Sequence, residues 1–283
     1  MAGEPNFGMP QAVSAAPASS PLSIEEFLRL PREFGWSYQH VDGCSLRTPQ
    51  VIPIPARIST AQKKEASLAG VREPGPGDKT ALADLYQAAF VGSRSYFGWG
   101  EDEVAEDAWH SVESFYEGER GEPDPSSRIA LDSEGLAGAA LVVRHREVPT
   151  LYLLFVSPAR HRRGIGGALI IAVLQALRAS GAPFLRSAFD GGDAAARAWY
   201  RAVGFVEEPS LPVALARLAW LRGEWERRGG SEEEGVAWRQ EMRQLSDAIR
   251  CLTDLAKAKG SEAVYPDLTV WQRRWWPKRL RGS

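Results

Sequence analysis

Cysteine is scarce in this chain, and long apolar runs are absent. Only two cysteines, Cys44 and Cys251, occur among the 283 residues, and they stand in unrelated sequence contexts. We therefore expect neither a disulfide framework nor a zinc site, and a reducing, cytoplasmic setting fits this usage best. No apolar run approaches the length needed to cross a membrane, and the N-terminus has neither the basic nor the apolar region of a secretory signal. We expect no membrane partner.

The chain also lacks a strong net charge and a metal-binding pattern. Its formal net charge is −2, so no global field favours nucleic acid, and we expect no nucleic-acid partner. Its four histidines form no constellation with other ligand-type residues, so no metal site is predicted. What is present is an ordinary globular composition, 44% hydrophobic and 25% charged, which suffices for one large or two modest domains.

The most informative stretch lies in the middle of the chain. Leu151–Val156 is an unbroken apolar run of strand length, typical of a buried central strand. Pro158 ends this run, since proline cannot donate to a sheet ladder. Four basic residues (160–163) and three glycines (within 164–167) follow, and an apolar pattern over 168–178 then predicts a helix.

A strand, a glycine loop and a helix in this order can hold an anion. The first turn of a helix has unpaired N–H groups and a partial positive charge, and glycine lets a phosphate approach the backbone. Arg160, Arg162 and Arg163 would add charge-assisted hydrogen bonds, so the expected ligand is a di- or polyphosphate. No Lys-Ser or Lys-Thr follows the glycines, as a P-loop requires, and Leu169 stands where a Rossmann turn needs glycine.

What remains is a motif that opens a helix and consists of Val156, Pro158, Gly164, Ile165 and Gly166. It resembles the coenzyme A pyrophosphate loop of the GNAT superfamily, the GCN5-related N-acetyltransferases. The resemblance covers about half the chain, from Leu68 to Val206. The family usually has Arg or Gln three residues before the first glycine, where this chain has His161. An ordinary strand-to-helix connection, with glycines for packing, is the alternative.

The resemblance implies an α/β (α+β) fold in which helices flank a central, mixed, twisted sheet, and it implies acetyl-CoA as the cofactor. In the family, two parallel strands splay apart, and the pantetheine arm of the cofactor pairs with the exposed backbone of the first strand. The residues expected to contact acetyl-CoA are Leu154, Phe155, Val156, His161, Arg162, Arg163, Gly164, Ile165, Gly166, Gly167, Ala168, Asp193 and Tyr200.

A second part of the resemblance lies at Trp199–Phe205, where a tyrosine precedes a Gly-Phe pair by four residues. It implies that Tyr200 is the general acid for the leaving thiolate, since a phenol can donate while neutral at pH 7. The alternative is that Tyr200 is a core residue of its helix. Asp193 stands where the family commonly has Asn, and it can still cap that helix. No general base is evident, and the residues near strand ends that could act through water are Asp190, Glu207 and Glu208.

In the family, the loop between the first two helices forms one wall of the acceptor pocket. Here the two helices are predicted at 78–90 and at about 101–116, and the loop between them is dense in aromatic residues. The substrate-contact candidates in this loop are Arg94, Tyr96, Phe97 and Trp99. The alternative is that these aromatic residues only pin a mobile loop to the core.

Four parts of the chain are predicted: a disordered tail (1–22), a small N-terminal appendage (23–66), the acetyltransferase domain (67–210) and a C-terminal helical hairpin with a tail (211–283). In the appendage, we expect a hairpin over 38–47, followed by prolines at 49, 53 and 55 that break regular structure. In the domain, we expect a hairpin over 127–145, and a strand over 184–189 that runs parallel to the central strand.

The C-terminal part is predicted to contain helices at 213–228 and 232–259. The second helix has a narrow apolar seam, formed by Trp238, Met242, Leu245, Ile249, Leu252 and Ala256. An internal helical hairpin is the default interpretation, and a homodimer seam is the alternative. Residues 268–271 could supply a last strand of the sheet.

The leading prediction is an N-acetyltransferase that moves an acetyl group from acetyl-CoA to a small-molecule or protein amine by direct attack. One alternative is a non-catalytic acyl-CoA sensor, which the missing carboxylate on the central strand, His161 and Asp193 keep open. Another is a scaffold that works through its appendage and its C-terminal helices. The sequence leaves the acceptor amine undetermined.

Overall fold

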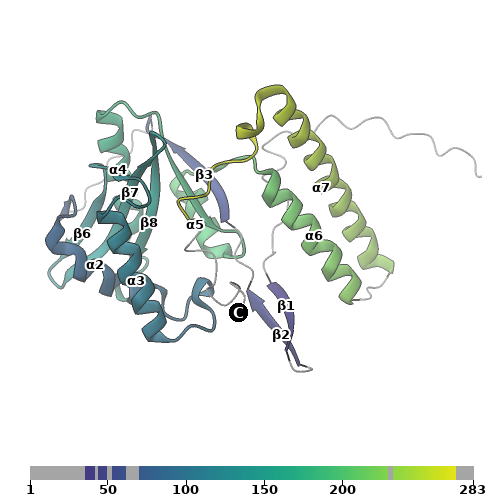
Figure 1. The fold of residues 1–283 in the computed structure, drawn as a ribbon, viewed down its shortest axis with the longest axis horizontal. Coiled ribbons are helices and arrows are strands. Elements are labelled where there is room, and N and C mark those ends of the chain that lie inside the picture. The colour runs from purple at the N-terminus through teal and green to yellow at the C-terminus, as the bar shows by residue number, and fades with distance from the viewer. Residues whose placement is uncertain (1–35, 42–43, 50–52, 62–69, 229–231, 272–283) are drawn as a thin grey trace, which may run out of the picture.

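The computed structural model describes residues 36–41, 44–49, 53–61, 70–228 and 232–271 (Figure 1). The predicted disordered tail and the end of the chain from residue 272 lie outside these residues. No helix of the described residues is both long enough and apolar enough to span a membrane.

The described part of the chain contains both strands and helices, and two long helices come near its end. The strands are β1 (Trp36–Val41), β2 (Cys44–Pro49), β3 (Pro53–Ser59), β4 (Val71–Arg72), β5 (Glu122–Pro123), β6 (Arg128–Asp132), β7 (Gly135–His145), β8 (Val148–Val156), β9 (Phe184–Asp190) and β10 (Val206–Glu207). The α-helices are α2 (Lys79–Phe90), α3 (Glu101–Tyr116), α4 (Ile165–Ala179), α5 (Ala194–Val203), α6 (Leu211–Arg228) and α7 (Glu232–Lys259), with short 3-10 turns that include η2 (Arg94–Tyr96) and η3 (Pro158–Arg160).

One large sheet organises the molecule. Its strand order is β10-β3-β9-β8-β7-β6-β4, and β5 pairs with β7 beside this path. β8 and β9 run parallel, whereas the other neighbouring pairs are antiparallel, so the sheet is mixed. The parallel pair is joined through α4, as a crossover connection requires. The predicted fold class, a central mixed sheet flanked by helices, is confirmed.

Helices cover both faces of this sheet (Figure 1). On one face, α2 and α3 pack on side chains such as Leu153 and Phe155 of β8. On the other face, α4 and α5 pack on a second core that includes Leu151 of β8. β8 is therefore buried on both sides, which explains why its sequence is a continuous apolar run rather than an alternating one.

β3 is the main departure from the sequence prediction. The prolines at 53 and 55 were expected to break structure, yet Pro53–Ser59 is a strand inside the sheet. It pairs antiparallel with β9 along its whole length and with β10 at Arg57 and Ala56. Ile54 and Ile58 are buried in the core beside α4. A segment placed in the predicted appendage thus completes the main sheet. The stabilisation from burying its apolar side chains is larger than the cost of the two backbone N–H donors that the prolines lack.

Most of the other predicted elements are found. The hairpin near residues 38–47 is the antiparallel pair of β1 and β2, and the hairpin near 127–145 is the pair of β6 and β7. The strand predicted at 184–189 is β9, parallel to β8. The short strand β4 pairs with β6 through Val71 and Arg72.

The C-terminal helices α6 and α7 lie side by side beyond the β3 side of the sheet (Figure 1), as the internal hairpin interpretation predicts. Val213 near the start of α6 joins the core around β3. The expected strand at 268–271 is wrong: these residues form a turn, and β3 already occupies the sheet position between β9 and β10. Val270 and Trp271 are instead buried against the α2–α3 side of the domain.

Candidate functional site

The site begins where the two parallel strands separate. The ladder between β8 and β9 contains a single residue pair, Thr150 with Arg186. β8 continues to Val156 and stays paired with β7 on its other side, and β9 continues to Asp190 and stays paired with β3. The edge of β8 that faces β9 therefore has unpaired backbone groups near Leu154, which a ligand with amide groups could use.

A cavity of about 680 Å³ lies at this end of β8. Its walls come from the end of α2, the end of β8, the loop before α4, the first turn of α4 and one face of α5. The lining residues are Ala89, Phe90, Leu154, Phe155, Val156, Arg160, His161, Arg162, Gly164, Ile165, Gly166, Gly167, Ala195 and Trp199. The apolar end toward β8 and the basic, glycine-rich end toward α4 suit an extended ligand with one anionic group.

The glycine-rich end presents unpaired amides. Among the described residues, no protein oxygen accepts a hydrogen bond from the backbone N–H of residues 162–167, whereas Ala168 already donates to the Gly164 carbonyl. Arg162 (φ 63°) and Gly164 (φ 79°) both have left-handed backbone conformations, which turn the loop into the helix. Unpaired N–H groups therefore lie where the sequence predicts an anion site, whereas the N–H groups of His161 and Ala168 are already bonded to the carbonyls of Pro158 and Gly164.

Among the three glycines of the loop, Gly166 is the one where a side chain would meet neighbouring atoms. A Cβ atom there would lie 3.2 Å from the Trp199 ring and 3.6 Å from Val156 Cγ2. Trp199 thus packs directly over the first turn of α4, and only a residue without a side chain lets the two approach this closely. At Gly164 and Gly167, by contrast, nothing lies within 4 Å of such an atom.

The basic side chains of the loop are not equivalent. Arg160 was expected to bind phosphate, and this is wrong: its Nε and Nη2 donate to Asp132 at 2.6 and 2.9 Å, and Nη2 also contacts Glu134 at 3.3 Å. The hydrogen bond from Arg160 lowers the pKa of Asp132. This pair fastens the loop to the β6–β7 turn. Arg162 and Arg163 are exposed and remain candidates for an anion.

His161 stands where the resembling family usually has Arg or Gln. Its side chain is exposed, and its Nε2 lies 3.2 Å from the carbonyl oxygen of Val156. A neutral or charged imidazole with Nε2 protonated can donate to this carbonyl. His161 therefore contacts the last carbonyl of β8 at the rim of the cavity.

Tyr200 lies beside the cavity rather than on its lining. Its hydroxyl is 3.0 Å from Ser187 Oγ and 3.5 Å from the Ala188 carbonyl oxygen, on the β9 residues that follow the last pair with β8. Its ring packs on Phe189 and Phe205. The hydroxyl thus lies against β9 just beyond its pair with β8, while the ring belongs to the core.

Asp193 caps α5, as predicted: its Oδ1 accepts a hydrogen bond of 2.9 Å from the Ala196 N–H. It does not line the cavity, whereas Ala195 and Trp199 do. These two residues are four apart and so share one face of α5. The sequence analysis did not predict these two residues, or Ala89 and Phe90, as part of the site. For Ala195 and Trp199, the spacing of four residues beside the Trp199–Phe205 motif could have indicated it.

The loop between α2 and α3 is held by several side chains. Tyr96 is buried, bonds to the Tyr86 hydroxyl at 2.7 Å and donates to Asp107, so it anchors the loop to both helices. Trp99 packs edge-on against Tyr96. Phe97 is 56% exposed. Tyr96 and Trp99 fit the alternative in which aromatic residues fasten the loop to the core, and none of the four predicted contact residues lines the cavity.

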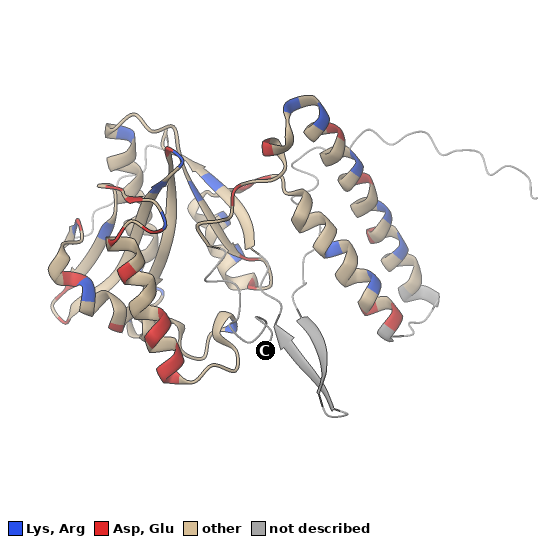
Figure 2. Ribbon diagram, viewed as in Figure 1, with Lys and Arg blue, Asp and Glu red and all other residues tan. Residues whose placement is uncertain are grey.

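The helix after this loop begins with acidic side chains. Glu101, Asp102 and Glu103 form its first turn, where they complement the partial positive charge of a helix N-terminus (Figure 2). Glu103 also accepts a hydrogen bond of 2.8 Å from the Gly100 N–H. This acidic turn therefore has a structural role in starting α3.

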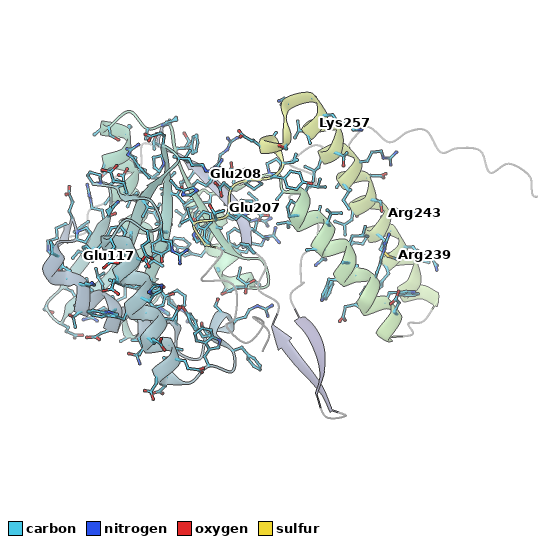
Figure 3. All side chains as sticks on the ribbon, in the orientation of Figure 1. Glu117, Glu207, Glu208, Arg239, Arg243 and Lys257 are labelled. Atoms are coloured by element: carbon cyan, nitrogen blue, oxygen red, sulfur yellow. The ribbon has the colours of Figure 1, made fainter. Side chains whose placement is uncertain are left out.

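The three carboxylates considered as bases are all paired with arginine. Glu207 accepts from Arg197 Nε at 2.7 Å, and Glu208 accepts from Arg186 Nε at 2.9 Å (Figure 3). Asp190 pairs with Arg94 at 2.9 Å. None of the three lines the cavity. Each carboxylate thus serves an ion pair, and a general base is not evident among the lining residues.

A family model agrees with this geometry. Residues 80–205 match the model of the acetyltransferase (GNAT) family. The chain is also similar to a GCN5-related N-acetyltransferase from Sphaerobacter thermophilus, with 18% identity, a TM-score of 0.42, and coverage of 55% of this chain and 48% of that one. A search of curated proteins gave no match.

Two further solved structures are each similar to about half of this chain. A GNAT family acetyltransferase from Brucella melitensis, in complex with acetyl-CoA, has 24% identity and a TM-score of 0.37, and the match covers 48% of this chain and 81% of that one. The ribosomal-protein-S18-alanine N-acetyltransferase from Escherichia coli has 23% identity and a TM-score of 0.36, with coverage of 50% and 83%. The match spans about half the length of the Sphaerobacter protein. The chain therefore contains, at residues 80–205, a domain of the acetyltransferase (GNAT) family.

Proposed function

We propose that this protein transfers an acetyl group from acetyl-CoA to an amine. The observation that carries the proposal is the row of unpaired amides at residues 162–167, on the rim of a cavity that begins at the open edge of β8. Unpaired N–H groups at a helix N-terminus bind phosphate oxygens. The unpaired backbone near Leu154 suits the amide groups of a pantetheine arm.

The chain's own residues would divide the work as follows. Amides of residues 162–167, with Arg162 and Arg163, hold the diphosphate. The N–H groups at the end of β8 face the place where charge develops on the thioester oxygen. The amine nitrogen bonds to the thioester carbon as the carbon–sulfur bond breaks, Tyr200 donates its proton to the departing sulfur, and the proton that the amine loses returns to Tyr200 through water. Bound acetyl-CoA supplies the activated acetyl group.

Binding is tested first, with coenzyme A as the probe in titration calorimetry. Gly166→Glu introduces bulk against Trp199 and a negative charge into the cradle, and we expect affinity to fall by at least about 100-fold, or roughly 2.7 kcal/mol. Gly223→Glu is the matched control, because it adds the same side chain to an exposed helical position with nothing within 4 Å. Equal affinities for the two variants would remove the anion site from the proposal.

Turnover is tested next, with thiol release from acetyl-CoA and a panel containing a polyamine, an aminoglycoside, free lysine and a peptide with an N-terminal alanine. Tyr200→Phe should slow transfer by roughly 10²–10⁴-fold and leave coenzyme A affinity unchanged. Ser187→Ala is the control, since it removes the neighbouring hydroxyl but not the acid. An unchanged rate in Tyr200→Phe would take Tyr200 out of the mechanism.

A second candidate function is an acyl-CoA sensor without turnover. It is favoured by the pairing of Asp190, Glu207 and Glu208 with arginine, which leaves no carboxylate base among the residues that line the cavity. The sensor predicts coenzyme A binding that Gly166→Glu abolishes, together with no thiol release above the Gly166→Glu background for any amine of the panel. Turnover in the panel would exclude it.

A further inference from the structure

An ion pair joins the loop between α2 and α3 to the end of β9. Arg94 Nε donates to Asp190 Oδ2 at 2.9 Å, and the two side chains are only 16% and 4% exposed. The other oxygen of Asp190 accepts from the Gly192 N–H at 2.9 Å. The guanidinium group lies against Gly192, since a Cβ atom at that position would be only 2.3 Å from Arg94 Nη2 and 2.7 Å from Nε. This is therefore a partly buried, hydrogen-bonded ion pair and not an exposed surface pair.

The ion pair connects the two sides of the gap between the strands. On one side, α2 packs on β8, with the Tyr86 and Phe155 rings 5.4 Å apart, and Phe90 at the end of α2 lines the cavity. On the other side, Asp190 is the last residue of β9. Beyond Thr150 and Arg186 no ladder pair links β8 to β9. The Arg94–Asp190 pair therefore links the two sides of the gap at a place where β8 and β9 are not paired with each other.

The loop end of this contact is itself firmly placed. Tyr96, two residues after Arg94, bonds to Tyr86 of α2 and donates to Asp107 of α3. The α2–η2–α3 unit thus behaves as one body, and a change at Arg94 shifts its position relative to β9 rather than only moving a loose side chain.

We propose that the Arg94–Asp190 pair, seated on Gly192, is a positioning device that sets the distance between the α2–α3 loop and the turn from β9 into α5, the helix whose Ala195 and Trp199 line the cavity. It would thereby align the acceptor amine with the thioester without contacting either. The inference rests on the proposed function and on Phe90, which lies at the end of α2 directly before this loop and lines the cavity. A displacement of about 1 Å at such a distance can reduce the rate of a transfer reaction by roughly 100-fold.

Gly192→Ala tests the pair without removing a charge, because the added Cβ must push the guanidinium away from its present place. With the panel amine that the wild type acetylates fastest, we expect KM for the amine to rise at least about tenfold and kcat/KM to fall by roughly 10–100-fold. The dissociation constant for coenzyme A should stay within about twofold, since the amides of residues 162–167 are untouched. Gly223→Ala is the matched control at an open position.

Arg94→Gln provides a second variant, so that a folding defect in Gly192→Ala does not decide the matter. Arg72→Gln is its control, because it breaks an ion pair with Asp78 at the other end of α2, far along the helix from the cavity. Both test variants should show the rise in amine KM, and neither control should. The inference is overturned if the test variants lower the melting temperature but keep the amine KM and kcat, or if coenzyme A affinity falls in parallel. A wild type without turnover refutes the proposed function instead.

Discussion

The strand β3 offers the sharpest test of the architecture, because it lies outside the region matched by the family model. Ile58 is 1% exposed and packs in the core between the sheet and α4. Ile58→Ala removes three carbon groups, worth about 2.4 kcal/mol at roughly 0.8 kcal/mol each. The cavity left behind adds to this cost, and changes of this type commonly total about 2–5 kcal/mol.

A loss of about 3 kcal/mol in the free energy of unfolding should lower the melting temperature by roughly 6–12 °C for a domain of this size. The assay is urea and thermal unfolding followed by circular dichroism. The control is Ser59→Ala, an exposed position on the same strand, for which a change within about 0.5 kcal/mol is expected. If Ile58→Ala cost no more than Ser59→Ala, β3 would not be part of the sheet, and its assignment to a separate appendage would stand.

Three other changes probe contacts that hold the fold together. Burial would raise the pKa of Asp267, but hydrogen bonds from Thr269 and His145 outweigh this effect and hold the pKa at about 2. The ionised carboxylate therefore stabilises the fold by at most about 2 kcal/mol, fully above pH 4, and this stabilisation is lost as the pH falls to 2. The urea midpoints of Asp267→Asn and the wild type should converge over that pH range. Glu207→Gln leaves Arg197 in a buried site without its carboxylate, and should cost about 3–5 kcal/mol in urea unfolding; a loss below 1 kcal/mol would contradict this reasoning. Gly138→Ala places a Cβ 3.1 Å from a β8 carbonyl and 3.2 Å from two α4 side chains, and should cost about 1–3 kcal/mol by the same assay.

Much of the candidate site could be predicted from the order of residues alone, because it is made of backbone. A buried strand, a break at Pro158 and glycines before a helix determine where unpaired N–H groups must lie, whatever surrounds them. The left-handed conformation at Gly164 can also be predicted from the local sequence, since it depends on local sterics. This is why the sequence alone could indicate unpaired N–H groups between Pro158 and α4.

Side-chain roles were less predictable. Arg160 and Arg162 are both basic residues of one loop, yet Arg160 turns to Asp132 while Arg162 stays at the rim. The distinction depends on the β6–β7 turn, which comes about 28 residues earlier in the chain. Tyr96 likewise read as a candidate for substrate contact, but its partners on α2 and α3 make it a buried anchor. Long-range contacts of this kind leave no local pattern.

What the sequence by itself determined is the set of elements with strong local signals: the apolar run of β8, the periodic helices α4 and α7, and the glycine loop between strand and helix. Only the tertiary structure decided which segment fills the position between β9 and β10. Both Pro53–Ser59 and residues 268–271 are short, apolar segments, and local propensity does not rank them. The choice follows from pairing and burial, because β3 finds a partner strand on each edge and buries Ile54 and Ile58 against α4, whereas Trp271 is buried on the opposite face of the sheet.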